Sequence, residues 1–212
     1  MSKVRFEITM SIDGFIAGPE QSEEEPLGIG GEALHEWAFA LAAWREMAGM
    51  EGGEENASTA VMEGLMANVG AGVMGRNMFG PIRGPWGDRK WEGWWGEEPP
   101  YHHPVYVLTH HAREPLEMKG GTTFIFVTDG IESAIAQAEA AAGDKDVSIG
   151  GGADVIRQGL DAEIVDELHI IVAPVILGGG ERLLENVGDP ELEPVEVVAS
   201  PAVTHVKYRV VR

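Results

Sequence analysis

The stretch Asp146-Val147-Ser148-Ile149-Gly150-Gly151-Gly152-Ala153-Asp154-Val155-Ile156-Arg157-Gln158-Gly159-Leu160 decides the fold that we expect for this chain. A short β-branched run enters three glycines, and apolar residues at helical spacing follow, which predicts a strand, a tight turn and the start of a helix. Glycines let a ligand approach the backbone, and the free N–H groups of a helix's first turn favour a phosphate. A glycine-rich turn without a ligand is the alternative, and the three glycines alone do not decide between the two.

Three familiar glycine motifs do not fit this turn. A Rossmann dinucleotide fingerprint needs a glycine where the chain has Val155, and it belongs to the first βα unit instead of a position well past the middle. No Gly-Lys-Ser/Thr follows, so the turn is not a P-loop. Asp146 stands two residues before Ser148 where a nucleophile elbow needs glycine. A hydrolase that uses Ser148 or a histidine is therefore a weak alternative, because no triad spacing is visible.

Composition excludes several classes of function. The 212 residues include 44% hydrophobic residues, which is sufficient for a substantial core. Fifteen Lys and Arg against 35 Asp and Glu give a net charge of −20, which argues against nucleic acid and anionic membranes as partners because both would be repelled. The absence of cysteine excludes disulfides, thiolate catalysis and cysteine zinc sites. No apolar run approaches the length of a membrane helix and no secretory segment is visible, so a cytoplasmic location is expected.

The remaining chain divides into alternating strand and helix patterns. Residues 3–8 predict a first strand, and residues 10–19 are either a functional loop or a plain turn at Asp13-Gly14 inside a hairpin. The other expected elements are helices at 32–50, 60–69 and 129–142, strands at 71–80, 105–109, 123–128 and 164–175, and an antiparallel pair at 195–199 and 203–211. No repeat or linker separates them, so one domain over residues 1–212 is the economical interpretation.

Two further places offer groups that could hold an anion. Arg76 lies in a Gly-Arg-Asn turn, where its guanidinium could bind a phosphate or instead pair with a nearby carboxylate. Thr109, His110 and Arg113 follow a strand and are expected at a helix start. The adjacent side chains of His110 and His111 point in different directions on any regular element, so we expect no metal site.

Residues 81–104 have no clean periodicity and hold four of the six tryptophans within ten residues. The frequent glycines and prolines of this segment interrupt helices and strands, so they predict a long loop. Its tryptophans either cover a ligand cavity or a subunit contact, or they form a satellite core packed under the loop.

Taken together, these pieces resemble the dihydrofolate reductase superfamily, and within it the group similar to the C-terminal reductase domain of the bifunctional riboflavin-biosynthesis protein. Five motifs in the family's order carry the resemblance: Ser11-Ile12-Asp13-Gly14-Phe15-Ile16-Ala17, Val73-Met74-Gly75-Arg76-Asn77, Val107-Leu108-Thr109-His110, Ile149-Gly150-Gly151-Gly152 and Pro174-Val175-Ile176-Leu177-Gly178-Gly179-Gly180. The resemblance implies an α/β fold with a central mixed, mostly parallel sheet flanked by helices and with antiparallel C-terminal strands. It also implies NADPH as the cofactor and a homodimer.

The cofactor residues that the resemblance implies fall into four groups. They are Ile16 and Ala17 beside the nicotinamide; Gly75, Arg76 and Asn77 near the adenosine-side phosphates; Leu108, Thr109, His110 and Arg113 at the ribose and its 2′-phosphate; and Ile149, Gly150, Gly151, Gly152, Ala153, Asp154 and Val155 at the pyrophosphate. NADP is favoured over NAD because Arg76 and Arg113 supply positive charge. Under this assignment, Gly151→Val should abolish cofactor binding without unfolding the sheet.

The chain departs from the family in the group that would supply the proton. Dihydrofolate reductases carry a carboxylate on the first helix, and Glu36 is the nearest candidate here, with Asp13 a weaker one. Glu36 is alternatively a solvated side chain. We expect an NADPH-dependent reductase that transfers hydride to a C=N or C=O group of a small heterocyclic substrate, similar to a pterin or an aminopyrimidine. The alternative is an NADP-binding homodimer without turnover, a sensor or a relic.

Overall fold

The structure, a computed structural model, describes residues 2–88 and 90–212. The described chain forms two compact units that alternate along the sequence. Unit 1 comprises the chain up to Phe6 together with Asn68–Asp166 and Asn186–Gly188, and unit 2 comprises Glu7–Ala67, Glu167–Glu185 and Asp189–Arg212. The expectation of one domain over residues 1–212 stays a prediction.

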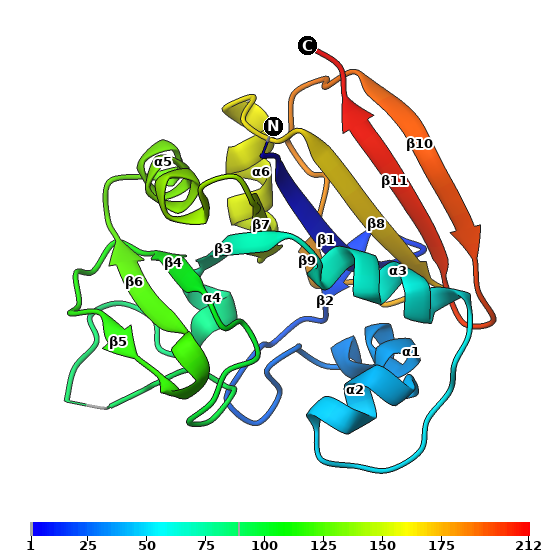
Figure 1. Cartoon of the computed structure of the whole chain (residues 1–212), viewed down its shortest axis with the longest axis horizontal. Helices are drawn as coiled ribbons and strands as arrows, with labels where there is room; N and C mark the ends of the chain where they lie inside the picture. Colours follow the sequence, from blue (N-terminus) through cyan, green and yellow to red (C-terminus); the bar gives the residue numbers. More distant parts are fainter. Residues whose placement is uncertain (1, 89) are drawn as a thin grey trace. The chain divides into compact units, whose positions relative to one another are not determined.

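Unit 1 is built on a mostly parallel sheet with the strand order β1-β7-β3-β4-β6-β5 (Figure 1). Its strands are β1 (Val4–Ser11), β3 (Val69–Gly75), β4 (Pro104–Leu108), β5 (Leu116–Glu117), β6 (Thr123–Val127) and β7 (Asp146–Gly151). Its helices are α4 (Arg76–Phe79), η2 (Lys119–Gly121), α5 (Ile131–Ala142) and α6 (Ala153–Asp161). In this order, the neighbouring strands β1, β7, β3, β4 and β6 are all parallel to one another. The short β5, at the end, is antiparallel to β6.

Continuous apolar runs explain the parallel strands, because a strand with both faces covered has no polar side. Val105, Tyr106 and Val107 of β4 are all buried. Helix α5 buries Ile131, Ala134, Ile135 and Ala138, a stripe at helical spacing, and it packs on β3, β4 and β7.

Unit 2 contains an antiparallel sheet with the order β10-β11-β8-β1, where β1 contributes its second half (Figure 1). The strands are β8 (Glu167–Ala173), β10 (Leu192–Ala199) and β11 (Thr204–Val210), and a separate small sheet pairs β2 (Phe15–Ala17) with β9 (Glu181–Arg182). The helices are η1 (Gly31–Leu34), α1 (Glu36–Phe39), α2 (Ala42–Met47) and α3 (Ala57–Met66). Both β8–β11 and β11–β10 are antiparallel pairs.

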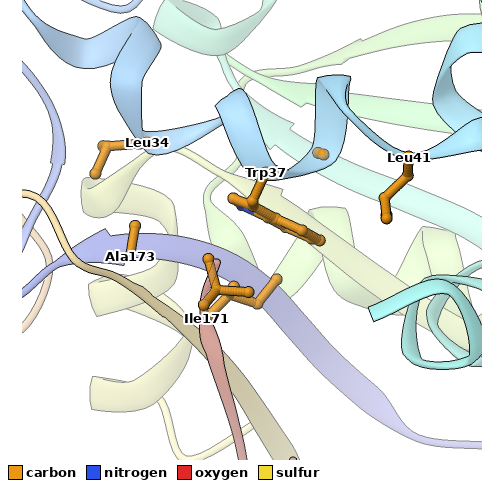
Figure 2. Close-up of a cluster of buried hydrophobic side chains, with 7 residues drawn as sticks. Leu34, Trp37, Leu41, Ile171 and Ala173 are labelled. Carbon is orange, nitrogen blue, oxygen red and sulfur yellow. The ribbon is translucent and has the colours of Figure 1, made fainter. Parts of the chain in front are cut away.

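The core of unit 2 is a cluster of apolar side chains from η1, α1 and β8 (Figure 2). Leu34 and Trp37 pack with Ile171 and Ala173, and Leu41 closes the cluster. The indole N–H of Trp37 donates to Thr9 Oγ1 at 3.3 Å, so the buried polar atom of this ring is satisfied.

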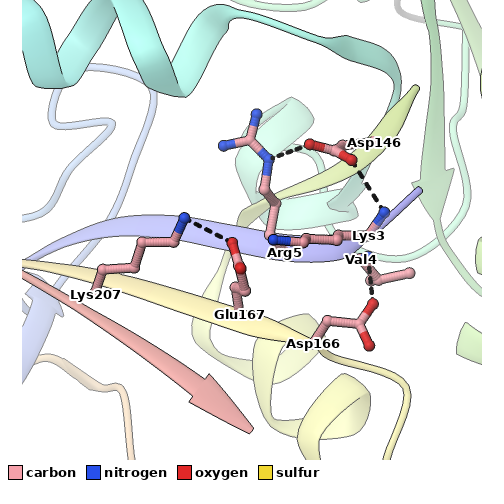
Figure 3. A network of polar contacts seen from close by, with 7 residues as sticks. All are labelled: Lys3, Val4, Arg5, Asp146, Asp166, Glu167 and Lys207. Carbon is pink, nitrogen blue, oxygen red and sulfur yellow. Dashed lines mark hydrogen bonds and ion pairs between the residues drawn. The ribbon is translucent and has the colours of Figure 1, made fainter. Parts of the chain in front are cut away.

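Polar contacts fix the beginning of β1 within unit 1 (Figure 3). Asp146 accepts a hydrogen bond from the backbone N–H of Lys3 at 3.0 Å and pairs with Arg5 Nε at 3.3 Å. The N–H of Val4 donates to Asp166 Oδ2 at 2.8 Å. Since a shift of one residue would turn every side chain of a strand to the other face, these contacts support the register that pairs Val4 with Val147.

The structure corrects three expectations about local structure. Residues 32–50 form η1, α1 and α2 instead of one helix, because Leu41 is extended and its neighbours exchange backbone hydrogen bonds with Glu54. The turn at Asp13-Gly14 does not close a hairpin, because β2 pairs with β9. No helix starts at residues 109–113, where the described backbone is irregular. The mostly parallel sheet and the antiparallel C-terminal strands are confirmed.

Candidate functional site

The glycine turn after β7 leads directly into α6, as the sequence predicts. Gly151 has φ 120°, Gly152 is the N-cap of α6, and the peptide bond between them is cis. Within the described chain no side chain caps this helix end. The N–H groups of the first turn of α6 therefore have no side-chain acceptor, and the helix dipole favours an anion at this end.

A second glycine keeps the approach to this turn free of side chains. A Cβ added to Gly75 would lie 2.9 Å from Val155 Cγ2 and 3.5 Å from the backbone nitrogen of Gly152. Glycine at position 75 therefore lets the end of β3 lie close to the turn before α6. The Met-Gly-Arg motif and the glycine turn are neighbours in unit 1 for this reason.

The geometry of the turn changes what a substitution at Gly151 would test. With φ 120°, any L side chain at this position strains the backbone, so Gly151→Val would alter the turn itself as well as obstruct it, and its effect on the sheet stays a prediction. Gly152 has φ −75°, and an added Cβ there meets no atom within 4 Å. Gly152 is therefore the position at which a side chain obstructs the turn without straining it.

Arg76 stands at the end of β3, where α4 begins. Its Nη1 donates to Thr109 Oγ1 at 3.0 Å, and its Nη2 donates to the carbonyl of Gly84 at 3.1 Å. Its Nε is buried and has no hydrogen-bond partner among the described residues. Burial, followed by repulsion from Arg113 and Arg83, lowers the pKa of Arg76 to about 10. The alternative in which Arg76 pairs with a carboxylate is not what the described structure shows.

Arg113 joins the same cluster from the segment after β4. Its Cζ lies 4.8 Å from the ring centroid of Trp86 and 5.1 Å from that of Phe126, and its buried Nη1 lacks a partner in the described chain. Burial lowers the pKa of Arg113, and the charge of Glu92 opposes this effect. Two half-buried arginines, each with one buried nitrogen that lacks a partner in the described chain, mark a place suited to an anion in a chain with a net charge of −20.

Thr109 connects the two arginine-bearing segments. Its buried hydroxyl oxygen accepts from Arg76 and from the N–H of His111, at 3.0 and 3.2 Å. Because a hydroxyl oxygen has two lone pairs, both of them are used and its hydrogen remains to be donated. Asn77 and His110 are exposed, and Leu108 is the last residue of β4.

The predicted site residues of unit 2 lie in different surroundings. Ile16 and Ala17 are buried in β2. Asp13 accepts hydrogen bonds from Ser11 Oγ at 2.7 Å and from the N–H groups of Leu177 and Gly178 at 3.1 and 2.7 Å. These bonds, the one from Ser11 foremost, lower the pKa of Asp13 to about 2, so its carboxyl is ionised at neutral pH. Glu36 is exposed at the start of α1.

A sequence model of the family described as the RibD C-terminal domain matches residues 2–206, nearly the whole chain. The chain belongs to the RibD C-terminal domain family. A comparison with curated proteins found no match.

Solved structures confirm the fold of this RibD C-terminal domain. A protein assigned to riboflavin biosynthesis from Shewanella sp. PV-4 is 23% identical with a TM-score of 0.65, and the match covers both chains completely. A pyrimidine reductase-like protein from Corynebacterium diphtheriae is 16% identical with a TM-score of 0.57, covering 100% of this chain and 92% of that one. The dihydrofolate reductase of Enterococcus faecalis, solved with NADP(H), is 15% identical with a TM-score of 0.54, covering 99% and 97%. The fold is that of dihydrofolate reductase.

Sequence reasoning missed three participants in the arginine cluster of this RibD C-terminal domain. The ring of Trp86 and the carbonyl of Gly84 come from the tryptophan loop, and the N–H of His111 supports Thr109. The density of tryptophans was the available signal, but it did not indicate which ring meets a cation. In the described chain, no group of three or more acidic or histidine side chains is placed to hold a metal ion.

Asp13→Ala in this RibD C-terminal domain is expected to release the turn at residues 176–180. The backbone N–H groups of Leu177 and Gly178 lose their acceptor, so their hydrogen exchange should accelerate by at least about tenfold. Hydrogen–deuterium exchange read by NMR measures the effect. Asp13→Asn keeps one carbonyl oxygen and should give a smaller acceleration. Equal exchange rates in the wild type and in Asp13→Ala would contradict the role of Asp13 as the acceptor of these two N–H groups.

Proposed function

We propose that this protein is an NADPH-dependent reductase that transfers hydride to a C=N or C=O group of a small heterocyclic substrate, similar to a pterin or an aminopyrimidine. The observation that carries the proposal is the arginine cluster of unit 1, in which Arg76 and Arg113 keep buried donors without partners. Membership of the RibD C-terminal domain family and the dihydrofolate reductase fold support it.

The residues of unit 1 fit a dinucleotide with several phosphates. The uncapped start of α6 and the turn from Gly150 to Val155 would hold the pyrophosphate through backbone N–H groups. Arg76, Thr109 and Arg113 would hold a phosphate on the adenosine side through charge-assisted hydrogen bonds. When bound, NADPH would supply the hydride. Ile16 and Ala17 would border the nicotinamide, as the family resemblance implies.

Two carboxyl groups of this chain, Asp13 and Glu36, are proposed to assist the proton transfer of the reduction. Asp13 is ionised at neutral pH, so it would orient or stabilise charge but would carry no proton to donate. Glu36 is exposed, and it remains the side chain that the family resemblance implies for the proton transfer, with water as the alternative donor. The homodimer and the cytoplasmic location remain proposals that the family resemblance and the composition support.

Calorimetric titration with NADPH and NADH tests the cofactor, and nicotinamide absorbance with a panel of pterins, aminopyrimidines and carbonyl compounds tests the turnover. We expect saturable NADPH binding and oxidation with at least one member of the panel. Arg76→Met should weaken NADPH binding by about 10- to 100-fold, because hydrogen bonds to a charged group are lost. Arg45→Met, at a half-buried arginine of α2 in unit 2, is the matched control.

Three outcomes separate the candidate functions. Binding with oxidation supports the reductase. Binding without oxidation of any compound on the panel favours the sensor or relic. Failure of the wild type to bind either dinucleotide overturns both, because each rests on the same cofactor.

A further inference from the structure

Trp86 is anchored from several sides in unit 1. Its indole N–H donates to the carbonyl of His111 at 2.8 Å. Its ring makes edge contacts with Phe79 and Phe126, with centroids 6.0 and 5.0 Å apart. A tryptophan held by a hydrogen bond and two perpendicular rings has little freedom to rotate, so its faces are fixed surfaces.

Both arginines of the cluster lie against this ring. The Cζ of Arg76 is 3.2 Å from the ring centroid, and the Cζ of Arg113 is 4.8 Å from it. The negative face of an indole attracts a guanidinium, and Trp is the strongest of the aromatic rings in this respect. The ring therefore offsets part of the repulsion between two like charges that lie close together on half-buried side chains.

The loop segment that carries Trp86 also accepts a hydrogen bond from the guanidinium of Arg76. The carbonyl of Gly84 accepts from Nη2 of Arg76, two residues before the ring that covers its guanidinium. On the other side, the carbonyl that anchors Trp86 belongs to His111, whose N–H supports Thr109. Trp86 thus links the β3–α4 turn to the segment after β4, and these are the two segments that carry the unsatisfied donors.

We infer that Trp86 is a positioning residue that holds Arg76 and Arg113 in place for one phosphomonoester, and so sets the preference of the protein for NADPH over NADH. The inference rests on the proposed function. NADPH differs from NADH only by the 2′-phosphate, which presents charge and acceptor oxygens that match the donors of Arg76, Arg113 and Thr109. Two arginines without the ring would repel each other and lose this arrangement.

Trp86→Leu and Trp86→Phe test the inference by calorimetric titration with NADPH and with NADH. Trp86→Leu removes the aromatic face and should lower the ratio of NADPH to NADH affinity by about tenfold, while the Kd of NADH changes by less than about twofold. Trp86→Phe keeps a ring but loses the N–H that binds His111, so the ratio should recover in part.

Trp95→Leu is the matched control, since it removes a tryptophan of the same loop and the same core. Trp95 contacts Phe124 and Tyr101, and no guanidinium of the described chain is placed over it. We expect Trp95→Leu to leave the affinity ratio unchanged. Circular dichroism melts of every variant show which of them are folded at the titration temperature, and if Trp86→Leu is not, Trp86→Phe carries the test.

The outcomes distinguish this inference from the proposed function. If the wild type binds NADPH and both Trp86 variants keep the wild-type ratio of NADPH to NADH affinity, the inference is overturned and the reductase proposal stands. An equal loss of NADPH and NADH affinity would also overturn it, because that result indicates a purely structural ring. Wild-type protein that binds neither dinucleotide would overturn the proposed function and this inference with it.

Discussion

Gly152→Val is expected to abolish detectable NADPH binding while the protein stays folded. Gly152 has an ordinary φ of −75°, and an added Cβ there meets no atom within 4 Å, so we expect the turn to accept a side chain at this position. The valine then fills the open space at the start of α6, where the first-turn N–H groups would meet the pyrophosphate. Losing charge-assisted hydrogen bonds at this point should raise the Kd by at least about 100-fold.

Calorimetry measures this loss, and a thermal melt followed by circular dichroism measures the fold. Gly188→Val is the matched control, because it also adds a side chain in open space, away from the glycine turn. Gly151→Val is unsuitable, since strain at φ 120° would weaken the turn itself and mix a loss of fold with a loss of binding. Wild-type affinity in a folded Gly152→Val protein would show that no phosphate is held by this turn.

Phe79→Ala is expected to destabilise unit 1 more than any exposed substitution in the chain. The ring of Phe79 is fully buried and makes edge contacts with Trp86, Phe124 and Phe126. Removing a buried phenylalanine costs about 3–5 kcal/mol, because contacts are lost and a cavity is left. For a chain of this size, that loss lowers the melting temperature by about 6–20 °C.

Differential scanning calorimetry checks this expectation, with Phe39→Ala as the control. Phe39 is half-buried in unit 2 and contacts His35 and Trp44, so its removal should lower the melting temperature less. Equal shifts in the two variants would contradict the central place of Phe79. Because Trp86 packs on Phe79, the folded Phe79→Ala protein should also show a reduced preference for NADPH.

The tryptophan loop forms the satellite core that one of the two interpretations predicts, while the other, that the loop covers a ligand cavity or a subunit contact, stays a prediction. Trp91 and Trp95 pack on the cluster around Phe79 and Phe124, which is the satellite core that one interpretation predicts. Trp86 belongs to the same cluster and also faces two guanidiniums, which gives the loop a part in the candidate site. The lack of a clean periodicity identified the loop, but the sequence could not show which tryptophan contacts a guanidinium.

Local pattern determined much of this protein. The apolar run of β4, the short strand β7, the apolar stripe of α5 and the glycine turn before α6 follow from the sequence, because side-chain spacing and glycine conformation act over a few neighbouring residues. The order of five short motifs was sufficient to indicate the family.

Tertiary structure alone decided the rest. The break at Leu41 depends on Glu54, the lowered pKa of Asp13 depends in part on N–H groups 164 and 165 residues away, and the arginine cluster includes the ring of Trp86. Each of these features requires a partner that the chain brings close only when it is folded. A pattern of single residues carries no information about which distant group will become that partner, and this is the physical reason why the sequence predicted the elements and not these contacts.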